Sequence, residues 1–318
     1  MKQTIEERRL ETRWDISRRD FLKACGAVAV SGVLYPFLAT AARSVESGLL
    51  LRFGLVTDIH YADVEPRGTR YYRESLRKLR ECVELMNSEN VAFLCELGDF
   101  KDQADPPSEE STLRFLHDVE HVFKDFNGPR YHVLGNHDMD SISKQEFLAA
   151  TGRSSSYYTF NNGGIHFIVL DACFTSDGED YDRGRFHWTD ANIPSAQLEW
   201  LASDLARTPY PAVAFVHQRL DGVGDPFVKN AEDVRTVLEA SGKVLAVFQG
   251  HDHSGGYRLI DGIHYYTLKA LVEGSGEENN SYAIVEVRTN GDIVVTGYRN
   301  AVSKELRCCR SVDAVSQR

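Results

Sequence analysis

The sequence predicts an α/β protein organised around a parallel β-sheet. From Leu50 to Leu134, short apolar runs alternate with amphipathic helical patterns in the order β-α-β-α-β. The apolar runs are nearly continuous, as in parallel strands buried on both faces, so we expect helices to cover both faces of this sheet. Polar residues follow several of the runs directly, at the strand ends where such sheets bind ligands.

The first part of the domain supplies three strands and two helices. The apolar runs Leu50–Val56, Val91–Leu97 and Tyr131–Leu134 are interpreted as buried strands. Thr69–Asn87 carries apolar residues at helical spacing with charged residues between them. Ser108–Lys124 has the same pattern and begins with serine residues that can cap a helix. Each helix therefore connects two neighbouring strands.

A hairpin and a long loop follow a short helix at Ser143–Ala150. Ser156–Phe160 and Ile165–Leu170 flank the sequence Asn-Asn-Gly-Gly, which is typical of a tight hairpin turn. Asp171–Ala191 is a long loop rich in aspartate, glycine and aromatic residues. Loops of this length are commonly functional, so it is either a substrate-side loop or an ordinary surface excursion.

The last part of the domain closes with an antiparallel run of strands. Two turns of this run are marked by Asp-Gly at 261–262 and Asn-Gly at 290–291. We expect residues 49–300 to form one domain and residues 301–318 to form a polar tail. Helices are expected at Pro194–Leu205 and Asn230–Ala240, and strands at Ala212–Val216, Val244–Phe248, Tyr257–Ile260, His264–Leu268, Tyr282–Val287 and Ile293–Tyr298.

The composition limits the classes of partner. The chain has 318 residues and a formal net charge of −11. Such an acidic protein is not expected to bind a nucleic-acid scaffold, because phosphate backbones are bound by basic surfaces. A small phosphate-bearing substrate is compatible with this charge, since bound divalent cations reverse the local sign. The sequence makes no prediction of the oligomeric state.

Residues 1–42 are expected to be an export signal. The sequence S-R-R-D-F-L-K at 17–23 precedes an apolar, small-residue stretch, Ala24–Ala42, which contains an Ala-x-Ala cleavage pattern at 39–41. This arrangement matches a twin-arginine signal, whose partner is the twin-arginine translocase. The stretch is also about long enough to be a membrane anchor, but its glycines and Pro36 favour a cleaved signal. We therefore expect a periplasmic or extracellular protein, tethered to the membrane if the signal stays uncleaved.

Metal-capable side chains follow five of the apolar runs. They stand at Asp58–His60, Gly98–Asp102, Gly135–Asp138, His217 and Gly250–His253. Aspartate, histidine and asparagine suit Mn²⁺, Fe²⁺ or Zn²⁺, and the lack of cysteine in these segments argues against a structural zinc site. Seven candidate ligands are too many for one ion. They suit two ions about 3.5–4 Å apart that share a carboxylate, as in two-metal phosphoester hydrolysis.

The ordered set D-x-H, G-D-x-x-D, G-N-H-D, H and G-H-x-H, from Asp58 to His253, resembles the calcineurin-like metallophosphoesterases. The resemblance implies a four-layer α/β/β/α sandwich of two mixed sheets flanked by helices, with the closing strands supplying the second sheet. It also implies hydrolysis of phosphoric esters by metal-activated hydroxide. In the implied metal sites, Asp58, His60 and His253 bind the first ion, Asp99 bridges, and Asn136, His217 and His251 bind the second ion.

The resemblance also implies the catalytic groups. His137 would contact the phosphate together with Asn136 and would protonate the leaving oxygen as general acid, and Asp102 would orient His137. Protein phosphatases of this superfamily have arginine directly after the second aspartate of G-D-x-x-D, where this chain has Gln103. That difference favours small phosphomonoesters or phosphodiesters, including nucleotides, over phosphoproteins. For Asp138, a structural cap is at least as well supported as metal contact.

The alternative function is a secreted metal- or ligand-binding protein on the same scaffold, without catalysis. A binding protein has no need of a non-ligand imidazole with a carboxylate beside it, whereas a phosphoesterase needs both. The presence of His137 and Asp102 therefore favours the enzyme.

Overall fold

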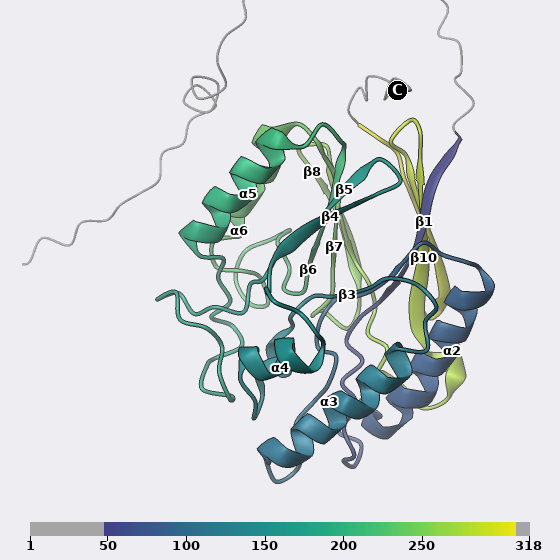
Figure 1. Cartoon of the computed structure of the whole chain (residues 1–318), viewed down its shortest axis with the longest axis vertical. Helices are drawn as coiled ribbons and strands as arrows, with labels where there is room; N and C mark the ends of the chain where they lie inside the picture. The colour runs from purple at the N-terminus through teal and green to yellow at the C-terminus, as the bar shows by residue number, and fades with distance from the viewer. Residues whose placement is uncertain (1–47, 310–318) are drawn as a thin grey trace, which may run out of the picture. The chain divides into compact units, whose positions relative to one another are not determined.

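The computed structural model describes residues 48–309, and within this range the strands form two six-stranded mixed sheets (Figure 1). The first sheet has the order β12-β11-β10-β1-β2-β3, and the second has the order β4-β5-β6-β7-β9-β8. The first sheet consists of β1 (Leu49–Val56), β2 (Leu94–Glu96), β3 (Arg130–His132), β10 (Ser281–Arg288), β11 (Ile293–Arg299) and β12 (Lys304–Leu306). The second consists of β4 (Tyr158–Asn162), β5 (Ile165–Val169), β6 (Ala212–Val216), β7 (Val244–Gln249), β8 (Gly256–Ile260) and β9 (Ile263–Thr267).

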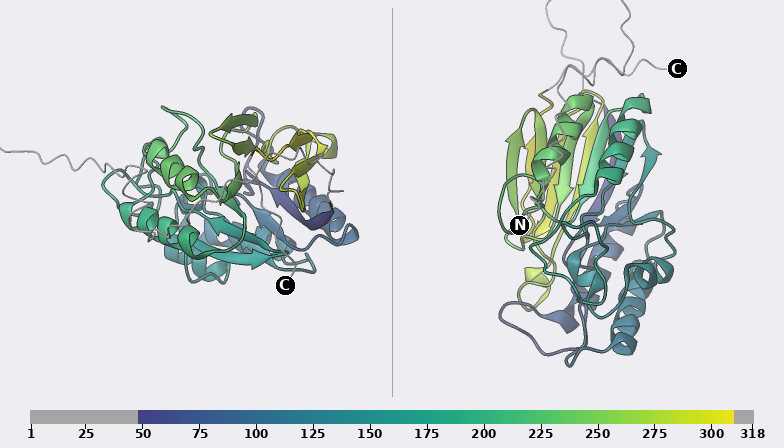
Figure 2. Two further views of the ribbon diagram at one scale, coloured as in Figure 1. Left: turned by 90° about the horizontal axis from the view of Figure 1, so that it is seen from above. Right: turned by 90° about the vertical axis from the view of Figure 1, so that its left-hand side faces the viewer.

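Helices cover only the outer face of each sheet, as the views in Figure 2 show. The apolar sides of α2 (Ser75–Ser88) and α3 (Glu109–Phe123) pack on the first sheet. Those of α5 (Ser195–Arg207) and α6 (Ala231–Ser241) pack on the second sheet. The expected four-layer α/β/β/α sandwich is confirmed. A short helix, α4 (Lys144–Ala150), and the 3₁₀ turns η1 (Tyr72–Glu74), η2 (Asn136–Met139) and η3 (Glu277–Asn279) complete the described elements.

An aromatic cluster joins the inner faces of the two sheets. Phe53 and Phe93 of the first sheet are stacked with ring centroids 4.8 Å apart, and Phe167 and Phe215 of the second are stacked at 5.7 Å. Phe53 meets Phe167 edge to face at 5.4 Å. All four rings are fully buried, and such pairs stabilise a core by about 0.5–1.5 kcal/mol beyond the area they bury. The two sheets therefore form a single rigid scaffold for the loops at their ends.

Two expectations about the layers are wrong. The parallel strands do not have helices on both faces, because their inner face packs on another sheet. An apolar strand face is satisfied by either partner, so the sequence pattern does not distinguish them. The closing strands also do not form the second sheet by themselves. β9 pairs parallel with β7, and β8 pairs antiparallel with β9, so these two strands join the second sheet. β10 instead pairs antiparallel with β1 and extends the first sheet.

The structure tests part of the expected C-terminal tail but not the expected export signal. Part of the expected polar tail is instead a strand, because β12 pairs with β11 and the side chain of Leu306 is buried. The expected export signal at residues 1–42 lies outside the described residues. No helix within residues 48–309 is both long enough and apolar enough to cross a membrane.

Local signals set the starts of α3 and α4 and one hairpin correctly, whereas α2 begins at Ser75 and not at the expected Thr69. The Ser108 side chain accepts a hydrogen bond from the Ser111 amide at the start of α3. The Ser143 and Glu146 side chains form a reciprocal capping box at the start of α4. β4 and β5 form the expected antiparallel hairpin, with the turn glycines at 163 and 164 in positive φ.

Candidate metal centre

The candidate ligands all lie on loops that follow the carboxyl ends of strands. Asp58 and His60 follow β1, and Asp99 follows β2. The loops after β3, β6 and β7 carry the other candidates, which are Asn136, His217, His251 and His253. Since both sheets contribute loops to the same edge of the sandwich, residues from the two halves of the chain meet there. The structure brings six of the seven together in two adjoining groups, and Asn136 lies in the turn that follows β3.

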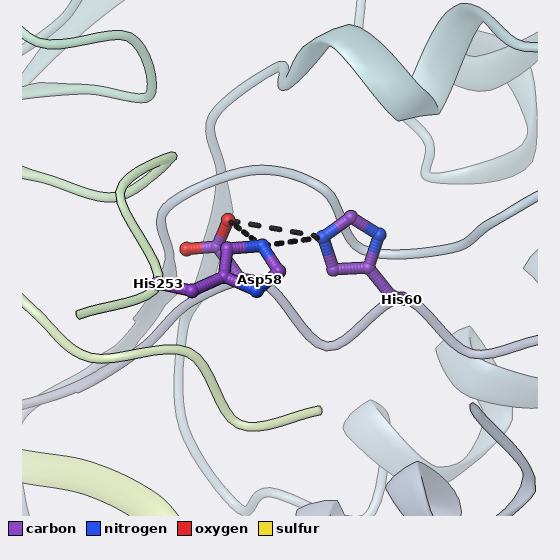
Figure 3. A group of neighbouring side chains, drawn as sticks. All are labelled: Asp58, His60 and His253. Atoms are coloured by element: carbon purple, nitrogen blue, oxygen red, sulfur yellow. Dashed lines mark hydrogen bonds and ion pairs between the residues drawn. The ribbon is translucent and has the colours of Figure 1, made fainter. Parts of the chain in front are cut away.

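The first ligand group consists of Asp58, His60 and His253 (Figure 3). The Nε2 atoms of His60 and His253 lie 3.2 Å apart. Asp58 Oδ1 lies 3.5 Å from His253 Nε2 and 3.8 Å from His60 Nε2. Three ligand atoms that converge on one point in this way fit a divalent cation with a mixed carboxylate and imidazole shell.

The second ligand group consists of Asp99, His217 and His251. His217 Nε2 lies 3.1 Å from Asp99 Oδ2 and 3.3 Å from His251 Nδ1. The same Oδ2 atom of Asp99 lies 3.5 Å from His60 Nε2 of the first group. Asp99 is therefore placed between the two groups, as a bridging carboxylate must be.

Asn136 supports the fit to a cation independently. Its side-chain Oδ1 atom is buried and has no hydrogen-bond partner among the described residues. Buried carbonyl oxygens are normally paired, because leaving one unpaired costs about 1–3 kcal/mol. A bound cation would satisfy this oxygen. The side chains present therefore fit two divalent cations.

Partners outside the two groups fix the orientation of three imidazoles. His60 Nδ1 donates to Asp102 Oδ2 at 3.2 Å, His253 Nδ1 to Glu273 Oε1 at 2.6 Å, and His217 Nδ1 to the Leu97 carbonyl at 2.8 Å. Each bond directs the other ring nitrogen toward the centre. Sequence reasoning missed Glu273, because it lies on a loop after β9 that carries no recognisable motif.

Asp138 holds two of the ligand loops together. Its carboxylate accepts hydrogen bonds from the amides of Asp99, Phe100, Lys101 and Gly135 at 2.8–3.3 Å. Gly135 is required here, because a Cβ atom at that position would lie 2.2 Å from the Asp99 nitrogen. Asp138 thus has the structural role that the sequence left open beside metal contact.

Four ligands have backbone in the left-handed region. The φ angles of Asp58, His60, Asp99 and His251 are 50°, 46°, 54° and 68°. This region is uncommon for residues other than glycine and costs of order 1–3 kcal/mol at each position. The surrounding sandwich and the hydrogen bonds to the Asp138 carboxylate hold the loops in these conformations. The directions of the ligand side chains are therefore set before any cation binds.

The carboxylates and imidazoles shift each other's protonation. Burial raises the pKa of Asp99, but the neighbouring His217 and His137 outweigh this and hold its pKa well below the ordinary value. Burial lowers the pKa of His217, but the Asp99 carboxylate outweighs this and raises it to about 9. Burial and the nearby His217 lower the pKa of His251 to about 3. Protons on the imidazoles thus balance the buried carboxylates, and a cation would replace them.

His137 lies beside the centre and faces two carboxylates, one of which is the expected Asp102. Its Nδ1 atom lies 2.7 Å from Asp140 Oδ2 and 3.7 Å from Asp102 Oδ2, and it forms no hydrogen bond with a described residue. The structure therefore places Asp102 closer to His60, and Asp140 closest to His137. Sequence reasoning missed Asp140, because two aspartates, Asp138 and Asp140, follow His137. The sequence does not show which of them the 3₁₀ turn η2 places beside the His137 ring.

The long loop at 171–191 reaches the centre. Trp188 is 45% exposed and its ring centroid lies 5.6 Å from that of His251. The loop is anchored by the Lys144 ammonium, which donates to Asp171 Oδ2 at 2.7 Å and to Asp180 Oδ1 at 2.6 Å. This anchoring makes it an ordered wall of the site instead of a surface excursion.

Comparisons with known proteins agree with this geometry. A model of the calcineurin-like phosphoesterases matches residues 51–255. The chain is 32% identical over 305 residues to the manganese-dependent ADP-ribose/CDP-alcohol diphosphatase of Mus musculus, covering 75% of this chain and 88% of that protein. It is 27% identical over 281 residues to the protein of the same name from Arabidopsis thaliana, covering 70% and 87%.

Among solved structures, a dimetal phosphatase from Danio rerio matches with a TM-score of 0.72 and 22% identity, covering 82% of this chain and 100% of that one. This likeness shows the fold. The family match spans every candidate ligand from Asp58 to His253, and the structure gathers six of the seven into two groups linked by Asp99. The chain therefore belongs to the calcineurin-like phosphoesterases, and it is a hydrolase of phosphoric ester bonds that uses two divalent cations.

Proposed function

We propose that the protein is a Mn²⁺-dependent hydrolase of small nucleotide derivatives. It cleaves the bond between the two phosphates of a nucleoside diphosphate derivative. The observation that carries this proposal is the position of Asp99 Oδ2, within 3.5 Å of imidazoles from both ligand groups. One shared carboxylate sets two cations close enough to act on the same phosphoryl group. The names of both relatives specify manganese dependence, and a ligand set of oxygens and imidazoles suits this ion.

Each residue of the centre has a defined task in this proposal. Asp58, His60 and His253 would hold the first cation, Asn136, His217 and His251 would hold the second, and Asp99 would contact both. Two cations at this place would neutralise charge on the phosphoryl group and would acidify the attacking water. His137 contacts the phosphate and donates a proton to the leaving oxygen. Its side chain is 28% exposed, so it can reach a bound substrate.

The substrate class rests on the relatives and on the wall of the site. The relatives are named for ADP-ribose and CDP-alcohols, both of which contain a planar nucleobase. Trp188 presents an exposed ring next to His251 of the second ligand group. Aromatic side chains bind nucleobases by stacking, at about 1–3 kcal/mol per base. A nucleotide can therefore place its phosphates on the cations and its base toward Trp188.

The proposal is tested by substrate profiling of the purified protein. ADP-ribose, a CDP-alcohol, p-nitrophenyl phosphate and bis-p-nitrophenyl phosphate are assayed with Mn²⁺, Zn²⁺ or Fe²⁺. We expect kcat/KM to be highest for the nucleoside diphosphate derivatives with Mn²⁺. Higher kcat/KM for p-nitrophenyl phosphate than for both nucleotides would overturn the substrate class. No turnover of any of the four substrates with any metal would overturn the enzyme.

We also propose that the protein is exported through the twin-arginine pathway to the periplasm or beyond. The support is the sequence alone: S-R-R-D-F-L-K before an apolar stretch with an Ala-x-Ala pattern. The translocase reads the arginine pair, so replacing Arg18 and Arg19 together by lysine should retain the protein in the cytoplasm. Fractionation of cells expressing the two forms is the measurement. Unimpaired secretion of the double variant would contradict the proposal.

A further inference from the structure

A lysine of α2 is fully buried beneath the loop that joins β9 to β10. Lysine is almost never fully buried unless its ammonium group is paired, and here the partners are backbone carbonyls. Lys78 Nζ donates to the carbonyls of Leu271, Glu273 and Gly274 at 3.0, 2.9 and 2.6 Å. An ammonium group has three N–H donors, so all of them can be used on one short segment, residues 270–274.

This segment is bonded to two ligands of the first ligand group, both of which Figure 3 shows. The Ala270 amide donates to the His253 carbonyl at 3.2 Å, and the Val272 amide donates to the Asp58 carbonyl at 3.1 Å. The side chain of Glu273 accepts a hydrogen bond from His253 Nδ1 at 2.6 Å. The backbone of both ligands and the ring orientation of one of them therefore depend on where the segment lies.

The segment in turn depends on Lys78. Of the four carbonyls between positions 271 and 274, three accept hydrogen bonds from the Lys78 ammonium group, and that of Val272 accepts one from the Tyr71 amide at 3.0 Å. A buried carbonyl that loses its donor is costly. Without the ammonium group, we expect the segment to move until its carbonyls find other partners.

The second ligand group is fixed by other contacts. The Asp99 amide donates to Asp138 Oδ2 at 3.0 Å, and His217 Nδ1 donates to the Leu97 carbonyl at 2.8 Å. Neither of these bonds involves the segment 270–274. A displaced segment should therefore affect the two cations unequally.

We propose that Lys78 is a positioning residue for the first cation. It contacts neither the cation nor the substrate, and it acts through the segment 270–274 on Asp58 and His253. Its three hydrogen bonds hold the segment, and the segment holds the two ligands in the directions that the cation requires. This inference rests on the two ligand groups and not on the substrate class proposed above.

The test compares Lys78→Met with Lys243→Met in the full-length protein. Lys243 makes a matched set of bonds, because its Nζ atom donates to the carbonyls of Leu205, Ala206 and Thr208 at 2.6, 3.4 and 2.7 Å. It precedes β7, whereas the ligand loop of that strand follows its other end. Both substitutions remove three contacts to carbonyls, but only Lys78→Met removes them beside the centre.

Binding of Mn²⁺ to the metal-free proteins is measured by calorimetric titration and by EPR, without substrate. We expect wild type and Lys243→Met to bind two equivalents with the same affinities. In Lys78→Met, one equivalent should bind about 10–100-fold more weakly, which is the loss typical of removing the support behind a metal ligand. The other equivalent should bind as in wild type. His253→Ala lacks a ligand of the first group and identifies the weakened equivalent.

A lysine that serves stability alone would lower Tm on substitution and leave both Mn²⁺ affinities unchanged, and that result would overturn the inference. Equal weakening of both equivalents in Lys78→Met, or the same weakening in Lys243→Met, would also overturn it. If Lys78→Met does not fold, Lys78→Gln replaces it, keeps a donor for the carbonyls and should show a smaller loss at the same equivalent. Since no substrate enters the titration, a failure here is distinguishable from a failure of the substrate profile.

Discussion

Asp99 is the residue on which both ligand groups depend. Its Oδ2 atom lies 3.1 Å from His217 Nε2 and 3.5 Å from His60 Nε2. Asp99→Asn replaces a charged bridge with a neutral group, so we expect metal content to fall and activity to vanish. His137→Ala should instead keep two equivalents per chain and lose roughly 10²–10⁴-fold in kcat with poor leaving groups. Elemental analysis beside kinetics checks both variants, and loss of one equivalent in His137→Ala would make His137 a ligand.

His217 makes cation binding depend on pH. Burial lowers its pKa but Asp99 raises it to about 9, so without a cation the ring is protonated at neutral pH. The proton must leave before Nε2 can bind, and the apparent affinity for Mn²⁺ should therefore rise at least about tenfold per pH unit below pH 9. His251, with its pKa lowered to about 3, is already neutral and does not contribute to the pH dependence of the Mn²⁺ affinity. Chelator competition at pH 6, 7 and 8 measures this, and equal affinities would contradict it.

The element that defines the substrate side is the loop at 171–191. Lys144 and the stacked rings of Tyr181 and Phe186, with centroids 3.9 Å apart, hold the loop so that Trp188 faces His251. Trp188→Ala should raise KM for nucleotide substrates about 5–100-fold, from the loss of one stacking contact, and Trp188→Phe should restore most of it. KM for an alkyl phosphate, which has no ring to stack, serves as the control. Equal increases for both substrates would show that Trp188 supports only the loop.

For the whole molecule, the cations should act as a clamp between the two sheets. Asp58, His60, Asp99 and Asn136 come from the first sheet, and His217, His251 and His253 from the second. Free Mn²⁺ a thousandfold above its Kd should stabilise the fold by about 4 kcal/mol. Chelation should then lower Tm by on the order of 10 °C. Thermal unfolding with and without EDTA checks this. Asp99→Asn is the control, and a wild-type Tm that EDTA leaves unchanged would contradict the clamp.

Much of this architecture could be predicted because its signals are local. Ser108, Ser143 and the hairpin glycines act within a few residues of their position, and each ligand loop directly follows an apolar run. The pairing of β10 with β1 could not be predicted, because it depends on two segments far apart in the sequence. Asp140 and Glu273 could not be predicted either, since only the folded loops bring their carboxylates under His137 and His253.

The wide separation of the ligands along the chain has a consequence for biosynthesis. His60 and His253 of the first ligand group are 193 positions apart. A nascent chain in which His217 has not yet been synthesised contains four of the seven ligands, and neither ligand group is complete. Domains fold from the N-terminus during synthesis, so the first sheet can begin to form while the centre still lacks its other half. Both ligand groups are therefore complete only once the chain has been synthesised beyond His253, and a product terminated before that residue lacks part of the centre.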